Sequence, residues 1–165
     1  MFGTVFQNDY IASDTIYNNI DFMRNCEYND VLESAKKAQA KEFISQTKDG
    51  FQTNLSARGT NISGGQKQRI LIARALANKP QCLILDDSSS ALDYKTDALL
   101  RAEINNNHTT SIIIAQRISS VMNCNHILVL EEGKMIGYGK HDDLLDNVPL
   151  YTKISQVQLG GGICE

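Results

Sequence analysis

The amino-acid sequence predicts an α/β domain whose sheet is mostly parallel. Short apolar runs with the character of strands alternate along the chain with stretches of helical spacing. Strands that are joined through helices form right-handed crossovers, which make neighbouring strands parallel. The chain has 165 residues, of which 42% are hydrophobic, and this is enough for one domain with a core of its own.

The expected strands lie at residues 1–6, 82–85, 111–115, 126–130 and 135–139. The run from Cys82 to Leu85 is wholly apolar between polar flanks, which is typical of a strand buried on both faces. The runs at 111–115 and 126–130 have the same character and are also expected to be buried. After a turn at 131–134 the last strand is expected to return antiparallel.

The expected helices lie at residues 30–47, 64–78, 90–105 and 141–157. The second helix follows a loop at 49–62 that is rich in Gly, Asn, Ser and Thr, and Pro80 ends it. The last helix is expected to be interrupted near Pro149. The segment 105–108, which includes His108, is expected to be a turn.

Composition excludes several classes of protein. The 16 basic and 19 acidic residues give a net charge of −3, which argues against a nucleic-acid binder held by bulk charge. No apolar run approaches the roughly 18–20 residues that cross a bilayer, and the start of the chain lacks the pattern of a secretory signal. The four cysteines have no CxxC or Cys/His spacing, so neither a disulfide framework nor a zinc site is expected.

The stretch NISGGQKQR at residues 61–69 carries the strongest chemical pattern. Ser63, Gly64 and Gly65 open an amphipathic helix, so backbone N–H groups and the positive helix end face outward, where an anion can approach closely. The pattern predicts a surface that faces phosphate. A lone SGG would more often be an ordinary serine cap with a flexible entry, so other motifs must decide between the two interpretations.

Three of the expected strands deliver a polar side chain at their carboxyl ends. The second strand leads into Asp86 and Asp87, the third into Gln116 and the first into Gln7. A carboxylate at such a position can hold Mg²⁺ through water, and its neighbour can orient or deprotonate an attacking water. The amide of Gln7 could reach a metal or water. This arrangement is typical of the ligand crevice of an α/β sheet.

These motifs together resemble the nucleotide-binding domains of ATP-binding cassette (ABC) transporters, particularly those of exporters. ISGGQKQR is similar to their signature motif, LILDD to the Walker B motif, SALD to the D-loop and Phe6-Gln7 to the Q-loop. TNLSARG, from Thr53 to Gly59, resembles the exporter X-loop. The resemblance follows the motif order over about residues 1–152.

The resemblance implies a P-loop NTPase-like core at 1–7 and 79–152, an inserted helical signature subdomain at about 10–78, and a flexible tail at 153–165. It also implies ATP and Mg²⁺ as cofactors. The implied site residues are Gln7, Ser63, Gly64, Gly65 and Gln66 for ATP, Gln7 and Asp86 for Mg²⁺, Asp87 and Gln116 for catalysis, and Ser90 and Asp93 for the D-loop.

The resemblance also implies partners. Two cassettes of this family pair head to tail, and each ATP lies between the Walker motifs of one and the signature of the other. The loops from Gln7 to Ser13 and from Thr53 to Gly59 would touch coupling helices of a transmembrane domain, on the cytoplasmic side of the membrane. Asn54 stands where exporters usually have glutamate, which puts the strength of that contact in doubt. No nucleic-acid partner is expected.

The chain departs from the family in lacking the sequence G-x-x-x-x-G-K-[ST], the Walker A loop that cradles phosphates. The family topology places the corresponding strand between those at 111–115 and 126–130. Its absence should leave a gap in the parallel sheet and a bare apolar flank. The chain is therefore expected to be the carboxyl-terminal part of a cassette, and to bind ATP poorly by itself.

Two further departures affect the chemistry. Asp87 stands where the family usually has a glutamate base, and Gln116 where it usually has a histidine switch. Together they resemble the degenerate half of a heterodimeric exporter, whose intact signature serves the partner's ATP. The alternatives are a truncated, non-catalytic remnant and a regulatory half that binds nucleotide without turnover. A chromosome-maintenance ATPase is disfavoured, since no heptad coiled coil interrupts the chain.

Overall fold

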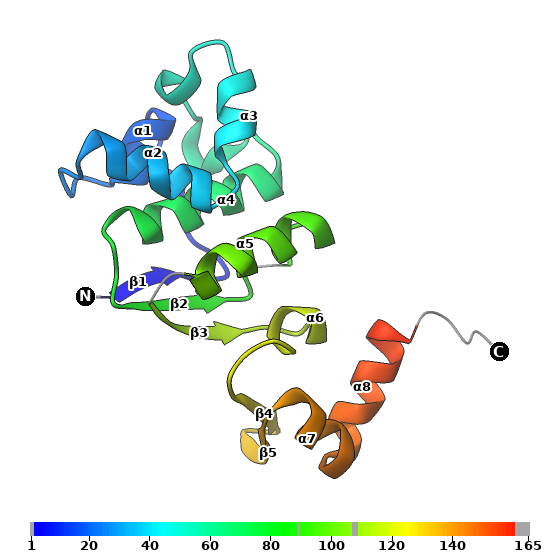
Figure 1. Ribbon diagram of the computed structural model, residues 1–165. Helices are drawn as coiled ribbons and strands as arrows, with labels where there is room; N and C mark the ends of the chain where they lie inside the picture. The colour runs from blue at the N-terminus through cyan, green and yellow to red at the C-terminus, as the bar shows by residue number, and fades with distance from the viewer. Residues whose placement is uncertain (1, 89, 107–108, 161–165) are drawn as a thin grey trace. The chain divides into compact units, whose positions relative to one another are not determined.

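The computed structural model describes residues 2–88, 90–106 and 109–160 (Figure 1). The chain divides into two compact units, Met1–Ile114 and Ala115–Glu165. No helix among the described residues has the length and apolar character needed to cross a bilayer. The two units are described in turn.

The described strands of the first unit form the predicted parallel sheet, and their order is β1-β2-β3. These strands are β1 (Phe2–Val5), β2 (Cys82–Asp86) and β3 (Thr110–Ile114). The register places Thr4 beside Ile84 and Ile84 beside Ile112. The carboxyl ends of all three strands therefore meet at one edge.

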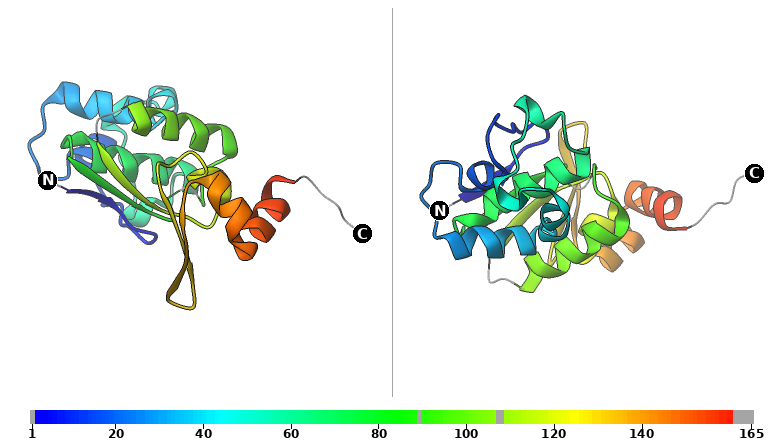
Figure 2. Two further views of the ribbon diagram at one scale, coloured as in Figure 1. Left: turned by 60° about the horizontal axis from the view of Figure 1, so that its bottom comes forward. Right: turned by 90° about the horizontal axis from the view of Figure 1, so that it is seen from above.

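One face of this sheet is covered and the other is open. Val5, Leu83 and Leu85 are fully buried against the helices, which lie on one side of the strands (Figures 1 and 2). On the opposite face Ile112 and Ile114 keep 50% and 52% of their surface exposed. The expectation that 111–115 is a buried strand is therefore wrong, because nothing in the described part of the first unit covers its second face.

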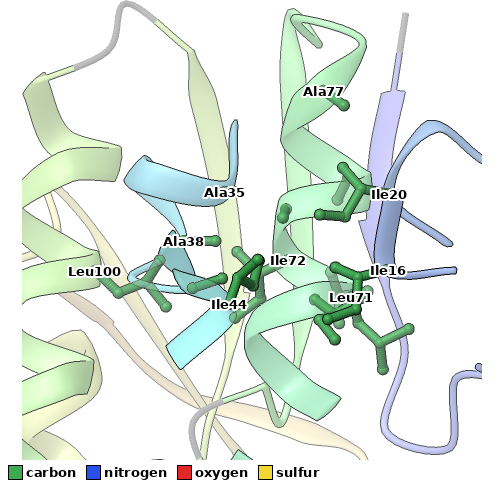
Figure 3. Packing of buried hydrophobic residues seen from close by; sticks show 14 of the residues in the cluster. Ile16, Ile20, Ala35, Ala38, Ile44, Leu71, Ile72, Ala77 and Leu100 are labelled. Carbon is green, nitrogen blue, oxygen red and sulfur yellow. The ribbon is translucent and has the colours of Figure 1, made fainter. Parts of the chain in front are cut away.

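Helix α4 (Gly64–Ala77) is the centre of the helical layer, and its bounds agree with the prediction to within one residue. A methyl group on Gly3 would come within 2.5 Å of the Ala75 carbonyl oxygen, so β1 lies directly against the backbone of α4. The core around α4 combines apolar side chains from all the helices of this unit (Figure 3). Those labelled in the figure are Ile16, Ile20, Ala35, Ala38, Ile44, Leu71, Ile72, Ala77 and Leu100.

The expected helix at 30–47 is in fact two helices, α2 (Tyr28–Lys37) and α3 (Lys41–Gln46). Gln39 takes a left-handed conformation with a φ of 57°, and the Ala40 N–H donates to the Ala35 carbonyl, which ends the first helix. A short helix that the sequence analysis does not predict, α1 (Ile16–Asp21), precedes them. Thr15 caps it by accepting a hydrogen bond from the Asn18 N–H at 3.0 Å.

Two 3₁₀ turns, η1 (Gly50–Gln52) and η2 (Ala57–Gly59), lie in the expected loop at 49–62. Helix α5 (Tyr94–Asn106) begins four residues later than expected, because Ser90 to Asp93 form the turn before it. Asn105 and Asn106, expected in a turn, end this helix instead. Residues 107 and 108, the rest of that expected turn, lie outside the described residues.

The second unit contains α6 (Ile118–Val121), β4 (Ile127–Glu131), β5 (Lys134–Gly139), α7 (His141–Asn147) and α8 (Pro149–Leu159). The strands β4 and β5 form the predicted antiparallel hairpin. Leu128 and Leu130 are more than half exposed, so the expectation of a buried strand at 126–130 is wrong. In the described residues β4 pairs with β5 alone, and Leu128, Leu130 and Tyr138 lie exposed on one face of this two-stranded sheet.

The helix expected near the end of the chain is interrupted at Pro149, as predicted. Residues 153–159, expected as the start of a flexible tail, continue helix α8. Ile118, Leu144 and Tyr151 join Ile127 and Val148 in a small core of this unit. The remainder of the expected tail, residues 161–165, lies outside the described residues.

Candidate functional site

The first part of the candidate site is the exposed tip of α4. Ser63 and Gly64 are exposed, and Gly65 and Gln66 are half-buried. Ser63 Oγ accepts from the Gln66 N–H at 3.2 Å, and the Ser63 N–H donates to Gln66 Oε1 at 2.9 Å. This capping box fixes the start of the helix. The N–H groups of Gly64 and Gly65 stand at the helix end, where they have no carbonyl partner within the helix and where the dipole favours an anion.

The turn from Ser90 to Asp93 packs against this tip. A methyl group on Gly65 would lie 3.1 Å from the Ala91 carbonyl oxygen, and one on Gly64 would lie 3.9 Å from the Ala91 Cβ. Glycine at position 65 therefore permits a close approach that a side chain would obstruct. The predicted signature and D-loop residues thus form one continuous surface.

Gln7 and Asp87 come together at the carboxyl edge of the sheet, as the ends of parallel strands must. Gln7 Nε2 donates to Asp87 Oδ2 at 3.3 Å. Asp87 adopts a left-handed conformation with a φ of 45°, and its N–H donates to the Ile114 carbonyl at 2.9 Å. Asp86, the last residue of β2, is half-buried beside it.

Asp93 acts as the cap of α5. Its carboxylate accepts hydrogen bonds from the Thr96 N–H at 2.9 Å and from Thr96 Oγ1 at 2.7 Å. These hydrogen bonds from Thr96 lower the pKa of the Asp93 carboxyl. Burial lowers the pKa of the Arg69 guanidinium, and the negative charge of Asp93 opposes that shift. Asp93 is therefore an ionised group near Arg69, which lies in the first two turns of α4.

A buried arginine, which the sequence analysis does not single out, joins the loop after Gln7 to α4. Arg74 Nη1 donates to the Tyr10 carbonyl at 2.7 Å, and its Nε donates to the Asn19 carbonyl at 2.7 Å. The guanidinium also lies over the Phe22 ring, at 4.2 Å from its centroid. Burial lowers the pKa of Arg74 to about 10. The sequence pattern that could have revealed it is a single charge within the apolar side of an amphipathic helix.

The two loops expected to touch a membrane domain lie side by side. The Arg58 N–H donates to the Ile11 carbonyl at 3.0 Å, and the Leu55 N–H donates to the Asp14 carbonyl at 2.9 Å. Asn61 stabilises the second loop, since its Oδ1 accepts a hydrogen bond from the Ser56 N–H at 3.0 Å. The loops from Gln7 to Ser13 and from Thr53 to Gly59 therefore present one surface.

Gln116 belongs to the second unit, and its side chain is exposed. Its carbonyl accepts a hydrogen bond from Gln158 Nε2 at 2.9 Å. The other predicted site residues belong to the first unit, which brings Gln7 next to Asp87 and the 63–66 tip next to Ala91.

The residues expected to hold Mg²⁺ supply the oxygen donors that this ion prefers, a carboxylate from Asp86 and an amide from Gln7. Mg²⁺ usually keeps several waters and takes further ligands from phosphate, so one carboxylate and one amide fit its protein ligands. In the described part of the chain no group of three or more His, Cys, Asp or Glu residues gathers closely enough to hold a metal.

A family model described as "ABC transporter" matches residues 1–90. Among curated proteins, the "Uncharacterized ABC transporter ATP-binding protein YfiB" of Bacillus subtilis (strain 168) is 45% identical over 159 residues, which are 96% of this chain and 28% of that protein. The "ATP-dependent lipid A-core flippase" of Francisella tularensis (strain SCHU S4 / Schu 4) is 39% identical over 156 residues, or 92% of this chain and 26% of the flippase.

Among solved structures, a bacterial Atm1-family ABC exporter with ATP bound is similar over 96% of this chain and 28% of the exporter chain, with a TM-score of 0.91 and 35% identity. The similarity extends over both units of the chain and includes the parallel sheet and the carboxyl-terminal hairpin. The chain spans little more than a quarter of the length of these relatives.

Proposed function

This chain belongs to the ABC transporter family, and from that premise we propose that it is part of the ATP-binding motor of an exporter. It would supply an intact signature to ATP bound mainly on a partner cassette. ATP-driven pairing of the two cassettes and hydrolysis would then power the movement of a solute across the membrane. The adjoining loops from Gln7 to Ser13 and from Thr53 to Gly59 would receive the coupling helices of the membrane domain.

The observation that carries this proposal is the exposed, glycine-opened tip of α4. Ser63 and Gly64 are open to solvent, so a phosphate on another polypeptide can reach them. The capping box holds the tip in shape before any ligand arrives. A tip buried within the unit would have ruled out this role.

We propose further that the site to which this chain contributes its own Walker B strand is slow or silent. The carboxylate of Asp87 is one methylene shorter than the usual glutamate, which draws it back by about 1.5 Å, and such misplacements can cost about 100-fold in rate. Asp87 also shares a hydrogen bond with Gln7. An amide at Gln116 can hydrogen-bond a phosphate but cannot carry the charge of a protonated imidazole.

The test is the ATPase rate of a two-cassette exporter in which one half carries residues 1–165 and the other half is intact. Ser63→Asp keeps a good helix cap but places a negative charge against the phosphate, so turnover should fall by about 100-fold or more. Asp87→Asn should change the rate by less than about twofold, because the partner's site performs the hydrolysis.

Ser45→Ala, on the exposed side of α3, is the matched control and should leave both the rate and the melting temperature unchanged. A large loss of turnover with Asp87→Asn would show that this half hydrolyses ATP itself. Normal turnover with Ser63→Asp would refute the proposed role of the signature.

The absence of a phosphate-cradling loop from these 165 residues also predicts weak nucleotide binding by the isolated chain. Titration of the chain with ATP and Mg²⁺, followed by calorimetry, should give an affinity far below that of a complete cassette. An affinity like that of a complete cassette would contradict this account of the missing loop.

A further inference from the structure

The carboxyl-terminal helix α8 holds the backbone on both sides of Arg117, the residue that follows Gln116. Gln158 Nε2 donates to the Gln116 carbonyl at 2.9 Å, and Gln158 Oε1 accepts from the Ile118 N–H at 2.8 Å. One amide side chain therefore binds a carbonyl and an N–H two residues apart. We call this pair of hydrogen bonds the Gln158 bridge.

The Gln158 bridge gives a hydrogen-bond acceptor to a backbone N–H that has no carbonyl partner within its own helix. Ile118 is the first residue of α6, and the first N–H groups of a helix have no carbonyl partner within it. The N-cap, Arg117, makes no side-chain capping hydrogen bond there. A side chain from the last turn of α8 therefore acts as the cap of α6 across 40 residues of sequence.

The bridge also acts on the segment that enters the small core of the second unit at Ile118. Ile118 is 5% exposed and lies in the small core of the second unit, whereas the Gln116 side chain is exposed. The core fixes the position of Ile118, and the bond to the Gln116 carbonyl fixes the backbone orientation one step further out. That orientation sets the direction in which the Gln116 side chain leaves the backbone and restricts its rotamers.

We propose that Gln158 is a positioning residue that sets the orientation of the Gln116 amide toward the terminal phosphate of ATP. This inference rests on the proposed function, because it takes Gln116 as the switch residue. It gives the helix at 149–159, which no motif of the sequence marks, a part in recognising the nucleotide.

Amide hydrogen exchange of the 165-residue chain tests whether the bridge exists in solution. Gln158→Ala should speed exchange of the Ile118 amide by about tenfold, as expected for the loss of one hydrogen bond. Gln158→Glu keeps an acceptor for the Ile118 N–H, so exchange there should remain slow. Gln156→Ala, an exposed glutamine on the same helix, is the matched control and should change nothing. Unchanged exchange in Gln158→Ala would overturn the proposal.

Nucleotide preference tests the positioning role. The probe is the ratio of ATP to ADP affinity in an exporter dimer, both halves of which carry residues 1–165. Gln116→Ala should lower this ratio by about tenfold, as the loss of a hydrogen bond to a charged phosphate requires. Gln158→Ala should lower it too, and so should Gln158→Glu, which cannot donate to the Gln116 carbonyl. The double variant Gln116→Ala/Gln158→Ala should be no worse than Gln116→Ala alone.

These outcomes separate the two proposals. A normal ratio in Gln158→Glu, with a lowered ratio in Gln116→Ala, would reduce Gln158 to a cap of α6 and leave the proposed function standing. An unchanged ratio in Gln116→Ala would remove Gln116 from the phosphate and overturn both the switch assignment and the positioning role. Additive losses in the double variant would also overturn the positioning role, because they would show that the two residues act independently.

Discussion

Arg74 shows how a single residue can connect several parts of the first unit. Its guanidinium binds carbonyl oxygens of Tyr10 and Asn19, and Asn19 Oδ1 accepts a further bond at 3.1 Å. Asn19 is itself fully buried, and its Nδ2 donates to the Ala12 carbonyl at 3.1 Å. The loop after Gln7, helix α1 and helix α4 are therefore joined through two polar side chains in an apolar setting, where unpaired polar groups are costly.

Arg74→Met should lower the free energy of unfolding by about 3 kcal/mol, because three acceptors would lose their donor in a buried site. Arg74→Lys should cost less, about 1–2 kcal/mol, since an ammonium keeps the charge but lacks the planar fork of donors. The measurement is urea denaturation of each variant. Arg58→Met, at an exposed arginine, is the control. An equal decrease in the free energy of unfolding there would show that the buried hydrogen bonds of Arg74 are not the cause.

The two glycines at the tip of α4 should respond differently to alanine. At Gly64 a methyl group meets only an ordinary contact at 3.9 Å, so Gly64→Ala should stabilise the chain by about 0.5–1 kcal/mol through helix propensity. At Gly65 the Ala91 carbonyl oxygen lies 3.1 Å from the new methyl group. Gly65→Ala should therefore leave the free energy of unfolding unchanged or lower it. Thermal melting of both variants checks this, and equal shifts would contradict the close packing of the turn at 90–93.

At the scale of elements, sequence predicts best those helices whose start and end are marked locally. Helix α4 has the Ser63 cap, continuous helical spacing and a stop at Pro80, so its bounds follow from the sequence. Helix α1 has six residues and depends on contacts with α4 and on the buried Asn19, none of which leaves a local pattern. The break at Gln39 is likewise tertiary, because Arg69 Nη1 donates to its carbonyl at 2.9 Å.

Burial of a strand is harder to predict than its existence. The apolar run at 110–114 forms the strand β3, but an apolar sequence cannot reveal whether a second layer covers its outer face. The same is true of β4, whose leucines face outward. Sequence periodicity describes the strand and not its neighbours.

The cap of α5 predicts a pH dependence of stability. Hydrogen bonds from Thr96 lower the pKa of Asp93, so the stabilising effect is present above the ordinary aspartate pKa of about 4 and is lost as the pH falls through the lowered value. Asp93→Ala should therefore reduce the melting temperature at pH 7, and this difference from the unsubstituted chain should narrow below about pH 4. Melting curves at pH 7, 4 and 3 check this, and a constant difference would show that the charge of Asp93 is not involved.

At the scale of the whole molecule, the contact between Gln7 and Asp87 and the exposure of the 63–66 tip could be anticipated from sequence. Both depend on general rules, namely that parallel strands end at one edge and that a glycine-opened helix starts at a surface. The Arg74 network and the Gln158 bridge could not be anticipated, since each links residues that lie 40 or more positions apart without a repeating pattern.

The open face of the first sheet predicts how the isolated chain behaves in solution. Phe2, Ile112 and Ile114 are all at least half exposed there, and such apolar faces promote association. The double variant Ile112→Thr/Ile114→Thr should bind less of a hydrophobic dye and stay monomeric at higher concentration. Dye fluorescence and sedimentation velocity measure the two effects. Equal association of the variant and the unsubstituted chain would show that the chain associates through another surface.

The absence of room at Gly3 has a mechanical consequence. Because the strand that leads to Gln7 touches the main chain of α4 without an intervening side chain, no soft layer separates them. Strand β1, which leads to the loop that would meet the membrane domain, and helix α4, which would meet the partner's ATP, should thus move as one rigid body. We therefore expect a displacement of one to move the other.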